Sequence, residues 1–369
     1  MTSLLPQIPQ NREPRPRAGI SRIPVYSSAL PSAVPILFRA SSNEAPTAPS
    51  PAVIAAVVER AGRGNRYPVI HGADLIEALA VSMNLPADRI SVGDGSLSLL
   101  NYLLLAFLEP GHRVVYAWRS YEAYPICVLT AGGEPVAVPL APDFSHDLDA
   151  MASEIDKQTD VVILCNPNNP TGMAFGREAL VAFLDSVPRR VIVVLDEAYR
   201  EFVDPAVIEP FDATELQELY PNLVILRTFS KAYALAGFRV GYLIAGVPIS
   251  AALASVLPPF PVAAAGVSAA IAALGEPDVT AALVGTIQHE RRAITDVLLA
   301  AGLPVVPSSA NFVWVPIGAS SDSLALRLRE SGISIRMFEG EGVRITVGEP
   351  GLPAALEAAL DGFTISHND

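Results

Sequence analysis

Between about residues 50 and 280, short runs of apolar and β-branched residues alternate with longer segments whose apolar residues recur at helical spacing. The runs contain few polar residues, which is typical of strands buried on both faces of a parallel sheet. The expected strands are residues 113–117, 135–140, 161–165, 191–195, 223–227 and 240–244. The alternation predicts an α/β fold whose mostly parallel central sheet is covered by helices.

The pattern changes near residue 280, where a long helical segment precedes short strands. The expected helices are residues 51–61, 74–83, 98–108 and 281–301, and the later strands are residues 312–315, 333–336 and 343–347. This mixture indicates a smaller α+β domain. We expect an N-terminal arm with part of the small domain at 1–49, a large domain at 50–275 and a C-terminal small domain at 276–369.

Three polar motifs follow three of the expected strands directly. Asn-Pro-Asn-Asn-Pro-Thr-Gly begins at Asn166, Asp-Glu-Ala-Tyr at Asp196 and Thr-Phe-Ser-Lys at Thr228. Open α/β sheets bind ligands outside the carboxyl ends of their strands. The three motifs are therefore expected to meet in one crevice.

Composition narrows the choice of partners and location. The net charge of −13 argues against nucleic acid or an anionic membrane as a partner. Cys127 and Cys165 lie in apolar runs and are expected to be reduced core residues. Residues 1–18 carry no apolar stretch like that of a signal peptide, and the long apolar stretch at 249–274 is broken by three prolines. We therefore expect a cytoplasmic protein.

The chain has only two lysines, Lys157 and Lys231. A GC-rich genome is a sufficient explanation for this scarcity. Lysine can nevertheless form an imine once its pKa is lowered, whereas arginine cannot. Lys231 stands in the third polar motif, whereas Lys157 precedes a strand in a polar stretch, so Lys231 is the candidate for a Schiff base.

The crevice residues suit pyridoxal 5'-phosphate, which withdraws electrons from a carbanion. Lys231 would form the imine and move the proton, while Asp196 would pair with the pyridinium nitrogen. Tyr199 and Asn168 would hydrogen-bond the phenolic oxygen of the ring. The phosphate would be bound by side chains and by a helix N-terminus. The expected phosphate-binding residues are Thr228, Ser230, Arg239, Gly95 and Ser96.

Each motif taken alone has a plainer explanation. Asp-Glu-Ala-Tyr can be a helix cap with a core tyrosine, and the asparagine-proline motif can be only a turn. Their order and joint spacing favour the cofactor site. Asp196 follows Asn168 by 28 residues, Lys231 follows Asp196 by 35, and Arg239 comes eight residues later.

With these motifs in hand, the chain resembles the fold-type I pyridoxal-phosphate aminotransferases, and within them the histidinol-phosphate aminotransferase family. The resemblance runs from about residue 23 to 360 and includes Thr-Phe-Ser-Lys-Ala-Tyr-Ala-Leu-Ala-Gly-Phe-Arg and the closing Gly-Val-Arg-Ile-Thr-Val-Gly at 342–348. The segments Trp-Arg-Ser-Tyr-Glu-Ala-Tyr-Pro at 118–125 and Asn-Phe-Val-Trp-Val-Pro at 311–316 look most like the aromatic amino acid (phenylalanine) aminotransferase branch.

The resemblance implies roles for further residues and implies no metal. Arg344 would bind the substrate α-carboxylate, and Tyr121 would stack on the cofactor ring, unless it is only a core tyrosine. Tyr67 would reach the phosphate of the neighbouring subunit's cofactor, so that a homodimer completes the site. Asn43 and Tyr26 would lie near the substrate.

Substrate identity is the open question. The expected reaction is ping-pong transamination between an aromatic L-amino acid and 2-oxoglutarate through a Lys231 aldimine. Arg336 stands where relatives that act on histidinol phosphate bind a second anion, so histidinol-phosphate aminotransferase is an alternative. The loop Pro-Pro-Phe-Pro at 258–261 lacks the polar residues such an anion needs, which favours an uncharged side chain. Departures in the arm and near residue 349 leave open an unusual amino acid of specialised metabolism.

Overall fold

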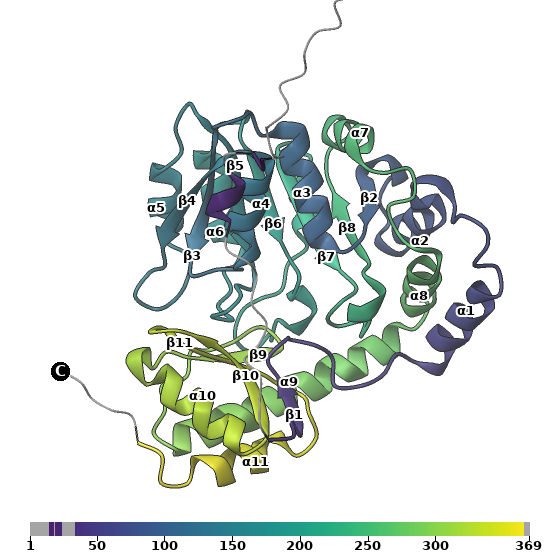
Figure 1. Ribbon diagram of the computed structural model, residues 1–369. Coiled ribbons are helices and arrows are strands. Elements are labelled where there is room, and N and C mark those ends of the chain that lie inside the picture. The colour runs from purple at the N-terminus through teal and green to yellow at the C-terminus, as the bar shows by residue number, and fades with distance from the viewer. Residues whose placement is uncertain (1–14, 18, 24–33, 365–369) are drawn as a thin grey trace, which may run out of the picture.

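The computed structural model describes residues 15–17, 19–23 and 34–364. Its larger part is built on a seven-stranded sheet in the order β2-β8-β7-β6-β5-β3-β4 (Figure 1). Strand β8 runs antiparallel to both of its neighbours, and the other neighbouring pairs are parallel. The strands are β2 (Ile90–Gly93), β3 (Arg113–Trp118), β4 (Glu134–Pro139), β5 (Thr159–Cys165), β6 (Ile192–Asp196), β7 (Leu223–Thr228) and β8 (Gly241–Ile244).

Helices cover both faces of this sheet. Buried residues of α1, α2, α5, α6 and α8 pack on one face, and those of α3, α4 and α7 pack on the other. Within β5, Val162 and Leu164 point to the first face, whereas Val161 and Ile163 point to the second. This double burial explains why the strands read as continuous apolar runs. These helices are α1 (Pro51–Ala61), α2 (Ala73–Met83), α3 (Ser96–Phe107), α4 (Ala123–Ala131), α5 (Leu148–Ser153), α6 (Arg177–Ser186), α7 (Val247–Val256) and α8 (Ala264–Leu274).

The smaller part holds a four-stranded sheet in the order β1-β10-β11-β9. The earliest strand of the described chain pairs with β10 in parallel, so residues from both ends of the sequence share one sheet. Helices α9, α10 and α11 share a hydrophobic core with this sheet (Figure 1). The elements are β1 (Phe38–Ala40), α9 (Pro277–Ala300), β9 (Phe312–Val315), α10 (Ser321–Glu330), β10 (Ile333–Phe338), β11 (Gly342–Thr346) and α11 (Leu352–Leu360).

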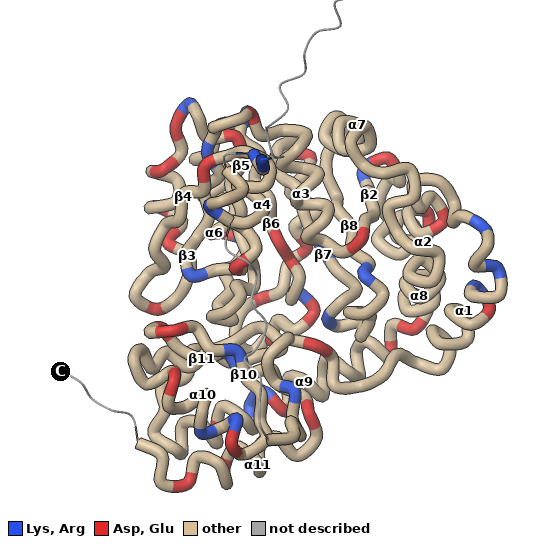
Figure 2. The backbone as a smooth tube through the Cα atoms, in the orientation of Figure 1, with Lys and Arg blue, Asp and Glu red and all other residues tan. Residues whose placement is uncertain are grey.

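The predicted fold class is confirmed, with two differences in detail. Strands β1 and β2 were not expected from the sequence, and the antiparallel direction of β8 was not expected either. The two parts are consistent with the expected domain boundaries, which stay a prediction. Acidic and basic positions are spread over both parts rather than gathered into a single stripe (Figure 2).

The apolar helices are short or bent. Among the described residues, no single helix has the length and apolar character to cross a membrane. Helices α8 and α9 meet those criteria only when taken together, and they are bent by 84° at the break between them.

Candidate active site

A cavity of about 410 Å³ lies at the carboxyl ends of the central strands, and the small sheet closes its other side. The ends of β5, β6 and β7 all contribute to it, as the three polar motifs predicted. Loop residues after β1 and two arginines of the small sheet complete the wall. The lining residues are Ser41, Ser42, Asn43, Glu44, Ser96, Leu97, Tyr121, Cys165, Asn169, Asp196, Ala198, Tyr199, Thr228, Ser230, Lys231, Ala236, Gly237, Arg239, Arg336 and Arg344.

Lys231 follows β7 and extends its amine into this cavity. Its Nζ donates to the carbonyl oxygens of Asn43 at 3.0 Å and Ser42 at 3.3 Å. Removal from bulk water, together with the smaller effect of the positive charge of Arg344, lowers the pKa of Lys231 to about 7, against the opposing effect of Glu44. A substantial fraction of this amine is therefore neutral near pH 7 and carries the lone pair that a nucleophile needs.

Asp196, the last residue of β6, is buried in the wall of the cavity. Tyr124 Oη donates to its Oδ2 at 2.8 Å, and the Ala198 amide donates to its Oδ1 at 3.1 Å. Burial raises the pKa of Asp196 to about 6, and the hydrogen bond from Tyr124 opposes that rise. A cationic nitrogen placed beside this carboxylate would relieve the cost of its burial.

Tyr124 was not predicted, although the sequence carries a signal for it. It lies three residues after Tyr121, which comes just before α4, and the Tyr124 amide donates to the Tyr121 carbonyl at 3.0 Å. The two rings meet edge to face with centroids 5.6 Å apart. Tyr121 lines the cavity, and Tyr124 is fully buried against Asp196.

Tyr199 also lines the cavity, and its hydroxyl is held by Asn43. Asn43 Nδ2 donates to Tyr199 Oη at 3.0 Å, while Asn43 Oδ1 accepts from Thr346 Oγ1 at 3.0 Å. The Tyr199 ring packs edge to face on Phe312 of β9. Asn43 lines the cavity and links the loop after β1 to Tyr199 and to Thr346 of β11.

The structure changes the prediction made for Asn168. Its side chain accepts from Ser120 Oγ at 2.7 Å and donates to Thr171 Oγ1 at 3.0 Å, and it is not among the lining residues. The neighbouring Asn169 lines the cavity instead, and its Oδ1 accepts from Arg344 Nη1 at 2.5 Å. Asn168 therefore holds the loop, and Asn169 faces the site.

The end of the cavity nearest Arg239 is built to receive an anion. Gly95 is at φ +81° directly before α3, and a Cβ there would lie 2.6 Å from Arg239 Nη2. Gly241 approaches the backbone of Ser96 so closely that a side chain would collide with it. The guanidinium therefore lies against the N-terminus of the 12-residue α3, where unpaired amides favour negative charge. Thr228 and Ser230 line the same cavity.

Two arginines of the small sheet line the cavity. Arg344 in β11 lies directly opposite Arg336 in β10 in the antiparallel register. Arg344 is buried; its Nη1 donates to Asn169 Oδ1, and its Nη2 donates to the Ser41 carbonyl at 2.6 Å. Arg336 Nη2 donates to Glu122 Oε2 at 2.7 Å. Glu122 was not predicted, because its arginine partner is 214 residues away.

Two of the predicted residues lie elsewhere. Tyr67 is 78% exposed, and its ring stacks on Phe260 with centroids 4.5 Å apart, away from the lining residues of this chain's own cavity. Tyr26 falls outside the described residues.

The size of the cavity and the chemistry of its lining residues fit pyridoxal phosphate. An amine with a lowered pKa shares the cavity with a buried carboxylate and with an anion-binding end shaped by two glycines. Arg344 supplies a separate place for a carboxylate. The model for class I and II aminotransferases matches residues 36–360.

The chain belongs to this aminotransferase family. It is 44% identical over 338 residues to the aromatic amino acid aminotransferase of Streptomyces coelicolor, covering 91% of this chain and 94% of that one. The corresponding protein of Thermobifida fusca is 42% identical over 344 residues, with 92% and 95% covered.

Solved structures agree with this assignment. Histidinol-phosphate aminotransferase from Sinorhizobium meliloti, in complex with pyridoxal 5'-phosphate, has a TM-score of 0.82 and 31% identity, covering 89% of this chain and 92% of that one. The aminotransferase is therefore a pyridoxal-phosphate-dependent transferase with the fold of these enzymes.

Proposed function

We propose that this aminotransferase moves an amino group between an aromatic L-amino acid and 2-oxoglutarate, with pyridoxal phosphate bonded at Lys231. The observation that carries the proposal is the place of Lys231 Nζ, in a cavity that also holds Asp196, Arg239 and Arg344. When bound, the cofactor supplies an electron sink for the negative charge that develops at the substrate α-carbon.

The protein's own groups would orient the cofactor and move the proton. Asp196, kept in place by Tyr124, would face the ring nitrogen, and Tyr199 with Asn169 would bind the phenolic oxygen. Arg239, Ser230, Thr228 and the Gly95–Ser96 turn would hold the phosphate. Lys231, with its lowered pKa, would bond to the aldehyde carbon and act as the base and acid at the α-carbon.

Arg344 is proposed to bind the α-carboxylate that both substrates share. Its guanidinium lies at the cavity wall with two of its nitrogens on neutral oxygens, those of Asn169 and Ser41. A planar carboxylate matches the fork of an arginine, and the added charge makes such hydrogen bonds strong.

An aromatic side chain is favoured by two observations. The relatives described above, which match over nine-tenths of the chain, are named aromatic amino acid aminotransferases. The cavity wall also includes Tyr121, Leu97 and Ala236, whose apolar surfaces suit an uncharged ring.

The test is a donor panel on the purified holoenzyme with 2-oxoglutarate as acceptor. We expect phenylalanine or tyrosine to give the highest kcat/KM, with one glutamate formed for each donor consumed. Faster turnover of histidinol phosphate would replace the aromatic assignment, and an absence of glutamate would contradict transamination to 2-oxoglutarate.

Histidinol phosphate is the second candidate because Arg336 lines the cavity and could bind its phosphate. The structure pairs Arg336 with Glu122, so such an anion would have to displace a carboxylate. This competition ranks histidinol phosphate below an aromatic donor.

A homodimer is proposed because Tyr67 cannot serve the site of its own chain. Its exposed ring, steadied by Phe260, would complete the phosphate site of a second copy. Tyr67→Phe should weaken cofactor retention. Mixed with Lys231→Ala protein, the Tyr67→Phe protein should form hybrid dimers in which one site lacks both changes, and retention at that site should be normal. Cofactor loss that does not respond to mixing would contradict a shared site.

A further inference from the structure

The two arginines of the small sheet face each other across neighbouring strands. Arg336 and Arg344 are register partners in β10 and β11, and both line the cavity. Like charges directly opposite each other on adjacent strands are unfavourable unless something compensates for them. For Arg336, a carboxylate from outside the small sheet, that of Glu122, provides such compensation.

Arg344 donates to the oxygens of Asn169 and Ser41, and Arg336 forms an ion pair with Glu122. Glu122 Oε2 lies 2.7 Å from Arg336 Nη2, and the two side chains are 29% and 14% exposed. Glu122 directly follows the cavity-lining Tyr121 and precedes the first residue of α4. The pair thus joins the large domain to the small sheet at the wall of the cavity.

We propose that Glu122 determines substrate specificity by competing with substrate anions for Arg336. This inference rests on the proposed function, in which one site accepts a neutral aromatic side chain and a dicarboxylate in turn. With an aromatic side chain bound, Glu122 keeps the Arg336 charge compensated. A side-chain carboxylate or phosphate that binds Arg336 Nη2 must displace Glu122 from it.

Competition of this kind lowers the affinity for anionic side chains without removing it. The pair is partly exposed, so breaking it costs less than breaking a fully buried pair. The α-carboxylate is unaffected because Arg344 binds it separately. Glu122 therefore changes the ratio of the affinities for anionic and neutral side chains. It does not change the contribution of the α-carboxylate, which both substrate classes share.

The structure offers a matched control a short distance away. Arg119 forms a two-point ion pair with Glu341 between β10 and β11, with its Nε donating to Glu341 Oε2 at 2.8 Å. This second pair joins the same two parts of the molecule with the charges reversed. Neither Arg119 nor Glu341 lines the cavity. A variant that breaks the Arg119–Glu341 pair therefore tests the effect of losing contact between the two parts without altering the cavity wall.

The experiment measures equilibrium binding of two non-reacting acids to the holoenzyme by titration calorimetry. Glutarate stands for the dicarboxylate, and 3-phenylpropanoate stands for the aromatic substrate. We expect Glu122→Gln to tighten glutarate binding about three- to tenfold, the range of a partly exposed ion pair, and to leave 3-phenylpropanoate within about twofold. Glu341→Gln should change both affinities by the same factor.

An unchanged ratio of the two affinities in Glu122→Gln would overturn the proposal, as would an equal shift of the ratio in Glu341→Gln. Adding Arg336→Gln to Glu122→Gln should remove the gain for glutarate, since Glu122 acts through that arginine. If Glu122→Gln does not fold, Glu122→Asp, which shortens the side chain by one methylene, gives the same test.

The proposed function can fail separately. Lack of 3-phenylpropanoate binding to the unaltered holoenzyme, together with no turnover of phenylalanine, would contradict the aromatic assignment. The glutarate comparison would still report whether Glu122 competes for Arg336.

Discussion

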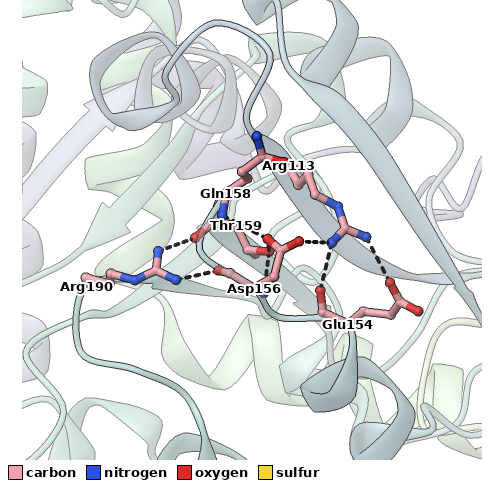
Figure 3. Close-up of polar contacts among 6 residues, drawn as sticks. All are labelled: Arg113, Glu154, Asp156, Gln158, Thr159 and Arg190. Atoms are coloured by element: carbon pink, nitrogen blue, oxygen red, sulfur yellow. Dashed lines mark hydrogen bonds and ion pairs between the residues drawn. The ribbon is translucent and has the colours of Figure 1, made fainter.

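Strand β5 connects two polar clusters with different chemistry. At its amino end, Asp156 accepts from Arg113 Nη1 at 2.6 Å, and Arg113 Nη2 donates to Glu154 at 2.9 Å (Figure 3). Arg190 Nη1 donates to the Thr159 carbonyl at 2.8 Å in the same cluster. At the carboxyl end lies the active-site cavity. Both ends hold carboxylates and arginines, so residue type alone does not distinguish them.

Burial and the choice of partner make the difference. At the amino end, exposed charges pair with one another and with nearby backbone, and hydrogen bonds from the Gln158 amide and from Arg113 lower the pKa of Asp156. At the carboxyl end, burial raises the pKa of Asp196 and lowers that of Lys231. The amino-end cluster thus stabilises a turn, whereas the cavity keeps groups poised to react.

The two lysines test this contrast with the largest expected effect. Lys231→Ala removes the amine that bonds to the cofactor and moves the proton, so we expect transamination to fall by at least about 10³-fold. Lys157→Ala, in the exposed turn of the other cluster, should leave initial rates unchanged. Rates with each variant and the absorbance of bound cofactor measure this. Equal activity of the two variants would contradict the proposal that only the cluster at the carboxyl end of β5 is catalytic.

The two aspartates give the next largest effect. Asp196→Asn should leave the fold intact but lower kcat about 10²- to 10³-fold, because the ring nitrogen loses its buried charge partner. Asp156→Asn should not change kcat. Steady-state kinetics combined with circular dichroism distinguish lost chemistry from lost structure, and normal kcat in Asp196→Asn would contradict its role.

The arginines separate substrate binding from turn stability. Arg344→Gln should raise KM for both substrates about 10- to 100-fold, the loss expected for charged hydrogen bonds to a carboxylate. Arg113→Gln should leave KM unaltered. A rise in KM for only one of the two substrates would mean that Arg344 does not bind the group they share.

The pH dependence of cofactor binding distinguishes Lys231 from an ordinary, exposed lysine. Below its pKa of about 7, Lys231 is protonated and has no free lone pair, so capture of pyridoxal phosphate by the apoenzyme should slow about tenfold for each pH unit. Above pH 7 the rate should level off, whereas an ordinary lysine would continue to gain reactivity up to 10.5. Rapid mixing followed by absorbance measures this rate. Because Arg344 lowers this pKa, Arg344→Gln should move the midpoint upward.

The smallest effect is expected at the amino end of β5. Arg190→Ala removes hydrogen bonds to the carbonyl oxygens of Asp156 and Thr159 and should lower Tm by about 2 °C. kcat and KM should stay the same. A loss of turnover without a change in Tm would show that the two ends of the strand are coupled.

Most of the large sheet could be predicted because its strands are buried on both faces and read as apolar runs. Strand β2 was missed because Ser91 and Gly93 leave it without a continuous apolar run. Strand β1 was missed because it is only three residues long and its middle residue is Arg39. The direction of β8 is absent from the sequence pattern, since an apolar run reads the same in either direction.

The location of the site could be predicted from the motifs at the strand ends. Details that depend on the course of the backbone could not be predicted. Asn168 and Asn169 are neighbours, and only the course of the loop decides which one faces the cavity. The Glu122–Arg336 pair joins residues from two domains, so it depends on how they pack. Tyr124 could have been found, because it follows Tyr121 by three residues and one turn of chain brings the two rings into contact.

The absence of side chains at Gly95 and Gly241 has a consequence for how this enzyme can diverge. The anion-binding end depends on backbone approaching backbone, so most single substitutions at these glycines would remove the cofactor. The substrate end depends on side chains from separate segments, such as Glu122 and Arg336, which can be exchanged one at a time. Substrate preference can therefore drift by single substitutions while the chemistry stays the same.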